Sequence, residues 1–133
     1  MIMFKEILPE KMYKGIYTST NDSHSGDVSM VKSNAEIEKI LKHFLDEVQQ
    51  KYQIVSAYLY GSFARGTSNK WSDIDVAIIS PDFSDDLFEE RLKLMKLAAS
   101  IDDRIEPKPF KKEMFDPNDP LVDEIQKNGI QVL

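Results

Sequence analysis

Two aspartates, Asp73 and Asp75, are the side chains of this sequence best suited to carry out chemistry. They stand at the start of an apolar run, Ile74 to Ile79, whose β-branched residues predict a strand. Side chains alternate between the two faces of a strand, so both carboxylates should lie on one face, roughly 7 Å apart. Like charges repel unless a cation lies between them, and Mg²⁺ prefers oxygen ligands. The pair therefore predicts a magnesium site.

A glycine and a serine, Gly61 and Ser62, end a first strand-like run over residues 54–60 and precede Asp73 by ten intervening residues. Glycine allows the backbone to approach a ligand closely, and the free N–H groups at a helix start attract anions. We therefore expect a strand, a turn with a short helix, a loop over 66–72 and a second strand. A phosphate-binding turn beside metal-binding carboxylates indicates phosphoryl or nucleotidyl transfer.

The spacing of Gly61-Ser62, ten residues and then Asp73-Ile74-Asp75 resembles the signature of the DNA polymerase β-like nucleotidyltransferase superfamily. The small size of the chain is similar to that of the minimal nucleotidyltransferase branch, whose members are antitoxins paired with HEPN-domain proteins. The resemblance covers residues 33–133. It implies an α/β fold with a small mixed β-sheet, in which helices pack mainly against one face and the carboxylates lie on the other.

The resemblance also implies a third acidic residue, on a strand that follows the intervening helix. Residues 104–110 are expected to form this strand, and their two prolines favour extended backbone at the edge of a sheet. Glu106 matches the third position. Asp102 and Asp103 are its rivals, although they lie where the helix should be ending.

The activity implied by the resemblance is the transfer of AMP from ATP, or of another nucleotide from its NTP, to a hydroxyl group. Asp73, Asp75 and Glu106 would bind two Mg²⁺ ions about 4 Å apart, which stabilise the attacking and leaving oxygens. The third carboxylate can take the proton of the acceptor, so a general-base histidine is not required.

The triphosphate would be held by Gly61 and Ser62, through backbone N–H groups and the serine hydroxyl. Arg65 is expected either to add positive charge there or to form a surface salt bridge. Larger nucleotidyltransferases carry further domains that grip the acceptor, and this chain has no room for one. The missing surface should come from a partner or from a homo-oligomer.

The acceptor implied first is a protein, because relatives modify a tyrosine of a partner HEPN RNase. A second interpretation is a nucleotidyltransferase that modifies a small hydroxylated molecule, as aminoglycoside nucleotidyltransferases do. A third belongs to another class of protein, a non-catalytic antitoxin that neutralises its toxin by occlusion. The intact set of three carboxylates favours catalysis over the third interpretation.

A helix over 33–51 should precede the first strand, with Ser33 and Glu36 as its capping box and an apolar stripe facing the core. His43 falls on its polar face and is interpreted as a surface residue. Residues 1–32 are expected to be an N-terminal arm and polar linker, with the nucleotidyltransferase domain at 33–133. The arm is interpreted as either an addition to the domain or an upstream misassigned start.

A second helix, running to about residue 101, follows the second strand, and Ser84 is its expected N-cap. Its predicted buried stripe consists of Leu87, Phe88, Leu92, Met95, Ala98 and Ala99. Arg91 falls inside this stripe. The sequence leaves two interpretations of Arg91: a side chain that extends its charged end into water, or an ion pair with an acidic residue of the site.

A last helix should begin at Pro120, with Asn118 or Asp119 as its cap, and end at Gly129 before a short terminal strand over 130–133. The length of 133 residues and the apolar fraction of 41% fit one folded domain.

The amino-acid composition argues against several classes of function. The 17 basic and 23 acidic residues give a net charge of −6, which argues against general nucleic-acid binding. The absence of cysteine excludes disulfides and is compatible with the cytoplasm. Apolar runs of membrane-spanning length and a signal-peptide core are absent from the sequence, so a membrane role is not expected.

Overall fold

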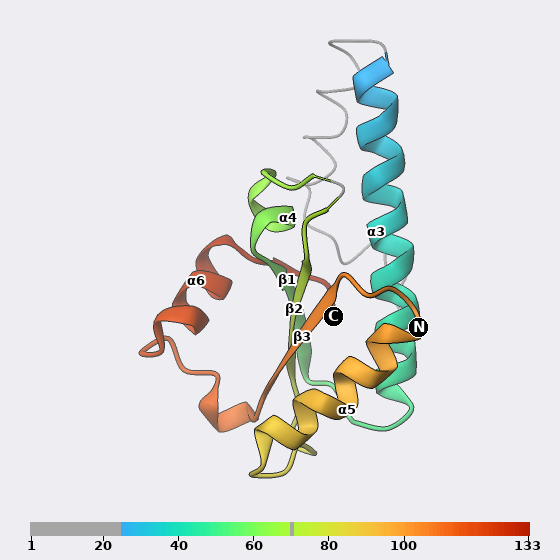
Figure 1. Ribbon diagram of the computed structural model, residues 1–133. Coiled ribbons are helices and arrows are strands. Elements are labelled where there is room, and N and C mark those ends of the chain that lie inside the picture. Colours follow the sequence, from blue (N-terminus) through green and yellow to red (C-terminus); the bar gives the residue numbers. More distant parts are fainter. Residues whose placement is uncertain (1–24, 70) are drawn as a thin grey trace.

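The elements of the fold follow the predicted order closely (Figure 1). The structure is a computed structural model that describes residues 25–69 and 71–133. Its helices are α3 (Ser25–Gln49), α4 (Ser62–Arg65), α5 (Leu87–Ala99) and α6 (Pro120–Asn128), with a 3₁₀ turn η1 (Lys112–Met114). Its strands are β1 (Ser56–Tyr60), β2 (Ile74–Ile79), β3 (Ile105–Phe110) and β4 (Ile130–Gln131).

The four strands form one mixed sheet in the order β3-β2-β1-β4. Strand β2 is antiparallel to β1 and parallel to β3, and α5 makes the crossover between the two parallel strands. The two prolines of β3 lie on an edge strand, as predicted, because an edge can do without their missing N–H groups. The mixed α/β sheet confirms the predicted fold class.

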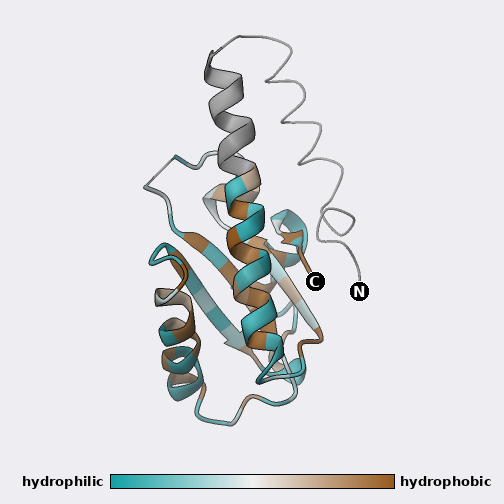
Figure 2. Cartoon of the chain, turned by 90° about the vertical axis from the view of Figure 1, so that its right-hand side faces the viewer, coloured by the Kyte–Doolittle hydropathy of each residue, from teal (hydrophilic) through white to brown (hydrophobic). Residues whose placement is uncertain are grey.

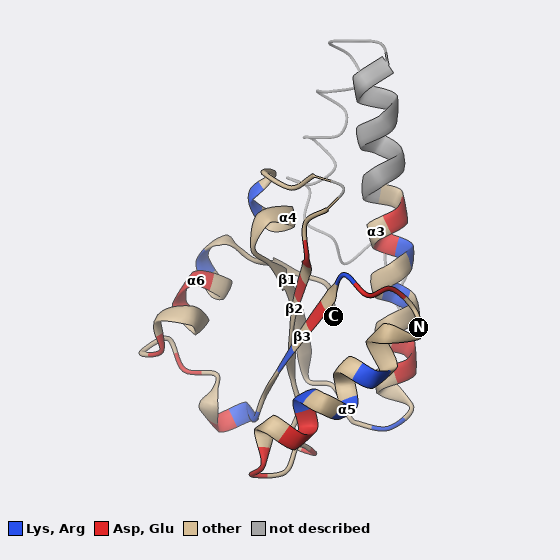
Figure 3. Ribbon diagram, in the orientation of Figure 1, with Lys and Arg blue, Asp and Glu red and all other residues tan. Residues whose placement is uncertain are grey.

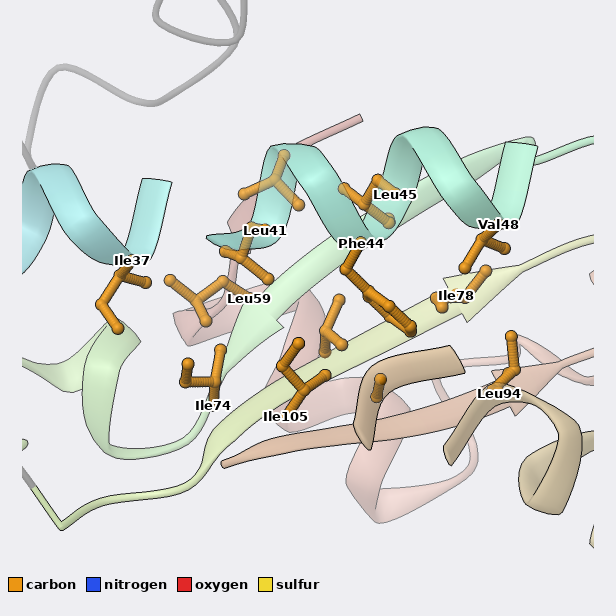
Figure 4. Close-up of a cluster of buried hydrophobic side chains, with 14 of the residues drawn as sticks. Ile37, Leu41, Phe44, Leu45, Val48, Leu59, Ile74, Ile78, Leu94 and Ile105 are labelled. Atoms are coloured by element: carbon orange, nitrogen blue, oxygen red, sulfur yellow. The ribbon is translucent and has the colours of Figure 1, made fainter. Parts of the chain in front are cut away.

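Helices cover both faces of the sheet (Figure 1). Figure 4 shows apolar residues of α3 packed over the side chains of Leu59, Ile74 and Ile78. Alternation along β2 turns Ala77 and Ile79 to the opposite face, where they pack with Val122 and other residues of α6. Helices α3 and α5 therefore occupy one face, and α6 shares the carboxylate-bearing face.

Helix α3 begins at Ser25, eight residues before the predicted start, so the proposed cap at Ser33 is wrong. Residues 25–32, predicted to be part of a polar linker, are helical. Once the amphipathic part of the helix (Figure 2) is anchored on the sheet, each further residue adds a hydrogen bond without a new nucleation cost. The rest of the predicted arm, residues 1–24, lies outside the described residues.

The predicted buried stripe of α5 is confirmed for Ala98, which is buried, and for Leu87, which packs against the core, but it is wrong at most other positions. Phe88, Leu92 and Met95 are exposed, and the buried residues of the helix are Glu90, Leu94 and Ala98. The helix carries two apolar stripes, and the sequence does not show which one faces the sheet. The cap is Asp86, whose side chain accepts the N–H of Glu89, instead of Ser84.

A buried carboxylate fixes the rotation of α5 about its axis. Glu90, only 3% exposed, accepts the hydroxyl of Tyr52 at 2.9 Å and the backbone N–H of Ser84 at 2.7 Å. Lys93 lies 3.6 Å from the same carboxylate. A buried charge needs such partners. The network therefore ties α5 to the segment between α3 and β1.

Across the described residues, 25–69 and 71–133, every helix is too short or too polar to cross a membrane.

We predict that Tyr52→Phe lowers the free energy of unfolding by about 1–3 kcal/mol, because it removes a hydrogen bond to a buried carboxylate. Urea unfolding followed by circular dichroism measures the change. Tyr58→Phe is the matched control, since the ring of Tyr58 stacks on Phe115 and should keep that contact. Equal losses in the two variants would contradict the role given to the Tyr52 hydroxyl.

Candidate active site

Strand register brings two of the predicted carboxylates side by side. Asp75 of β2 is paired with Glu106 of β3 on one side and with Tyr60 of β1 on the other. Because neighbouring strands lie about 4.8 Å apart, these three side chains form a row on the face that α6 also covers. Figure 3 shows acidic positions on the adjacent strands β2 and β3. The structure thus places Glu106, as predicted, beside Asp75.

The rival acidic residues are used elsewhere. Asp102 accepts the backbone N–H of Arg104 at 2.9 Å and its Nη2 atom at 2.9 Å, in the turn before β3. The hydrogen bond to the Arg104 guanidinium holds the pKa of Asp102 below its usual range. Asp103 is exposed. Neither residue lines the pocket into which Asp75 and Glu106 point.

This pocket has a volume of about 470 Å³, within the range of small-molecule sites. It is lined by Tyr60, Asp73, Asp75, Arg91, Glu106, Pro107, Lys108 and Leu121. All three predicted carboxylates therefore line one hollow. The predicted phosphate-binding residues Gly61, Ser62 and Arg65 do not line this pocket, but Gly61 lies against Asp75 and the charge of Arg65 acts on the same carboxylate.

The interior of the pocket favours positive charge. Burial raises the pKa of Asp75, and the nearby carboxylates of Asp73 and Glu106 raise it further, while Arg65 opposes them. Burial also raises the pKa of Tyr60 to about 12, with Asp75 as the next cause. Both shifts disfavour another negative charge, so a bound cation would relieve the repulsion.

Gly61 is required by the close approach of Asp75. Its φ angle is +73°, a conformation that other residues rarely adopt. A Cβ atom added there would overlap Oδ2 of Asp75 and lie 3.1 Å from its Cγ. Helix α4 starts at the next residue, and the N–H of Arg65 donates to the carbonyl of Gly61 at 3.1 Å. The Gly61 turn and strand β2, which carries Asp75, are therefore in direct contact.

Both arginines singled out in the sequence have an acidic neighbour in the structure. Arg65 forms a surface ion pair, 3.8 Å from Oε1 of Glu124 on α6. Nη2 of Arg91 lies 3.5 Å from Oε2 of Glu106, so Arg91 pairs with a site residue. His43 is exposed, as predicted, and faces Glu47.

The side chains of Asp73, Asp75 and Glu106 offer carboxylate oxygens on one face of the sheet. Such oxygens are the ligands that a hard cation prefers. Among residues 25–69 and 71–133, a basic side chain does not lie within ion-pair distance of Asp73 or Asp75, whereas Glu106 is paired with Arg91. In the described part of the chain, three acidic or histidine side chains do not gather closely enough to hold a metal together. A metal held by Asp73 and Asp75 would be bound by Glu106 as well only after the Glu106 side chain had moved.

Four further lining residues were not predicted from the sequence, and one of them, Pro107, is the neighbour of Glu106 on β3. Lys108 is two positions after Glu106, and the period of a strand could have placed it on the same face. Tyr60 reaches the pocket because of the antiparallel register of β1, and Leu121 because α6 folds back over this face. The last two depend on tertiary structure that a local pattern does not contain.

Comparison with known proteins agrees with this geometry. Residues 41–131 match the nucleotidyltransferase domain family. A protein of Methanocaldococcus jannaschii, provisionally named a protein adenylyltransferase, is 34% identical over 80 residues, which are 59% of this chain and 74% of that protein. The protein adenylyltransferase MntA of Shewanella oneidensis is 35% identical over 68 residues, which are 51% of this chain and 46% of MntA.

Solved structures share the fold. A provisionally named nucleotidyltransferase from Sulfolobus solfataricus superposes with a TM-score of 0.56 at 19% identity, over 76% of this chain and 83% of that chain. A toxin–antitoxin structure with AMP-PNP gives a TM-score of 0.52 at 23% identity, over 71% of each chain. At these identities the likeness establishes the arrangement of sheet and helices.

We predict that Gly61→Ala destabilises the fold by about 1–3 kcal/mol and also displaces Asp75, because the new methyl group takes the space of its carboxylate. Gly66→Ala is the matched control, since Gly66 has a φ of +76° but open space around its Cβ position. Urea unfolding and Mn²⁺ binding are measured for both variants. Equal losses of stability and of Mn²⁺ affinity would contradict the contact with Asp75.

We predict that Asp75→Asn raises the melting temperature at pH 7 by about 2 °C in the absence of divalent cations. The pKa of Asp75 is raised in the fold, so protonation favours folding and ionisation opposes it. The stabilising contribution of the protonated carboxyl is present below its ordinary pKa of 3.8 and is lost as pH rises through the folded value.

The difference between Asp75→Asn and wild type should therefore be absent at acidic pH and increase toward neutrality, as calorimetry across pH will measure. Asp103→Asn is the control, because this exposed carboxylate lies outside the pocket. A gap that closes as pH rises would contradict the argument.

Proposed function

The chain belongs to the nucleotidyltransferase domain family, and we propose that it transfers AMP from ATP to a hydroxyl group of a partner protein. The observation that carries the proposal is the row of side chains across the sheet, in which Asp75 lies between Glu106 and the Gly61 turn. This arrangement joins a carboxylate site suited to cations and a turn suited to phosphates.

In the proposed reaction, Asp73 and Asp75 would hold Mg²⁺, and Glu106 would be the third carboxylate. Bound Mg²⁺ would neutralise the charge that develops on the attacking and leaving oxygens. The acceptor oxygen forms a bond to the α-phosphorus of ATP, and the bond from that phosphorus to the bridging oxygen of the β-phosphate breaks. AMP is then joined to the acceptor, pyrophosphate leaves with the bond electrons, and Glu106 takes the acceptor proton.

The triphosphate is assigned to the turn that opens α4. The N–H groups at the start of a helix have no acceptor within the helix, and the Ser62 hydroxyl adds a further donor. Gly61 keeps this turn against Asp75, so phosphates held by the turn would lie next to the metal-binding carboxylates. Arg65 adds positive charge near Asp75, although it also pairs with Glu124.

A protein acceptor is favoured by the open form of the site. The pocket is lined by residues of β1, β2, β3, α5 and α6, and the exposed side chains of Phe88 and Met114 lie along a neighbouring hollow. The relatives named as protein adenylyltransferases support this acceptor class. A fold neighbour belongs to a toxin–antitoxin structure with AMP-PNP. We therefore take the acceptor to be a tyrosine of a HEPN-type toxin, with this chain as its antitoxin.

We predict that the purified chain, with Mg²⁺ and ATP labelled on the α-phosphate, labels a co-expressed HEPN-domain protein on tyrosine. Asp73→Asn and Asp75→Asn should each lower the initial rate at least about 100-fold, because a metal ligand acts mainly in the transition state. Asp103→Asn should keep the wild-type rate, since this residue lies outside the pocket. Mass spectrometry identifies the labelled residue.

An antitoxin that works only by occlusion gives a different result. The double variant Asp73→Asn with Asp75→Asn would then protect cells from the toxin as well as wild type at matched protein levels. Protection without labelling would disprove the catalytic proposal and leave the family assignment intact. Loss of labelling in Asp103→Asn, or in Asp102→Asn, would instead move the third carboxylate away from Glu106.

A further inference from the structure

Arg91 lies at the border of the carboxylate pocket with open space on two sides. Its Nη2 atom is 3.5 Å from Oε2 of Glu106, and the side chains are 48% and 35% exposed. Arg91 also lines the neighbouring hollow, together with Phe88 and Met114. The guanidinium can therefore leave Glu106 without unfolding or repacking a buried core.

The position of Arg91 follows from the residue before it. Glu90 is buried and held by Tyr52 and the backbone of Ser84, which fixes the rotation of α5. The next side chain along a helix is turned by about 100°. This rotation directs Arg91 over the edge strand β3 toward Glu106, and it is set by contacts that lie away from the pocket.

The pair of Arg91 and Glu106 differs from the structural pair of Arg104 and Asp102. In the latter, Nε, Nη2 and the backbone N–H of Arg104 all donate to the Asp102 carboxylate, at 2.9 to 3.1 Å. Arg91 makes a single, longer contact, and an exposed pair of this kind is weak. A divalent cation can therefore displace it.

We propose that Arg91 is the internal counter-ion of Glu106, and that it holds the third carboxylate away from Asp73 and Asp75 until a metal takes its place. The inference rests on the proposed function, because it assumes that these carboxylates bind a cation. It makes Arg91 a positioning residue. A metal added alone binds first through the two aspartates, and the contribution of Glu106 is largely offset by the loss of its contact with Arg91.

The test is a double-mutant cycle on the full chain, read by the affinity for Mn²⁺ alone. Free Mn²⁺ is measured by electron paramagnetic resonance, without nucleotide or acceptor. The background variants are Arg91→Met and Lys108→Met. Lys108 is the matched control because it also lines the pocket, so its loss changes the local charge equally without releasing Glu106. Thermal melting confirms that each protein is folded.

We expect Arg91→Met to bind Mn²⁺ about threefold to fivefold more tightly than wild type, the ratio that corresponds to a weak exposed ion pair. Glu106→Gln should weaken Mn²⁺ binding by less than about twofold in wild type and in Lys108→Met. In the Arg91→Met background, Glu106→Gln should weaken Mn²⁺ binding about threefold to fivefold more than it does in wild type, because Glu106 is then free to bind the metal.

Two results would overturn the inference while leaving the metal site standing. One is an equal cost of Glu106→Gln in all three backgrounds, and the other is equal tightening by Arg91→Met and Lys108→Met, which would report charge alone. Failure of every protein to bind Mn²⁺ would instead overturn the metal assignment of the proposed function, and this inference with it.

Discussion

The structure depends on one constraint, which is that the carboxylate of Asp75 lies where its ionised form is unfavourable. The carboxylate of Asp75 lies against the backbone of Gly61, partly buried and between two other acidic residues. Each of these surroundings raises the energy of the ionised form. Such strain is typical of functional sites, where the rest of the fold supplies the stability that the site lacks. Here that support is the central position of β2, whose Ile74, Val76 and Ile78 are completely buried.

The arrangement of strands explains why these particular residues meet. An antiparallel pair joins β1 and β2 through the Gly61 turn, and a parallel pair joins β2 and β3 through α5. Because both pairings share β2, Asp75 becomes the common neighbour of the Gly61 turn and of Glu106. The residues between Asp75 and Glu106 in the sequence form a single crossover connection, which contains α5. The site is therefore a property of the β2–α5–β3 unit and the turn before it.

Sequence reasoning was accurate where local chemistry decides the structure. The bounds of β2 were predicted because a run of β-branched residues buried on both faces has few alternatives. The edge position of β3 followed from its prolines, and the end of α6 from Gly129. The start of α3 was missed because its upstream part carries no pattern of its own and extends a helix anchored elsewhere.

The rotation of α5 is the case in which the sequence misleads, and it also matters most for the site. An apolar stripe through Phe88, Leu92 and Met95 predicts burial of that face, since hydrophobic burial is the dominant favourable term. Glu90 reverses this outcome, because Tyr52 and Ser84 satisfy its carboxylate inside the protein. The rotation that buries Glu90 leaves the apolar stripe exposed and directs Arg91 toward Glu106. One buried hydrogen-bond network thus determines both the surface beside the pocket and the charge that faces its third carboxylate.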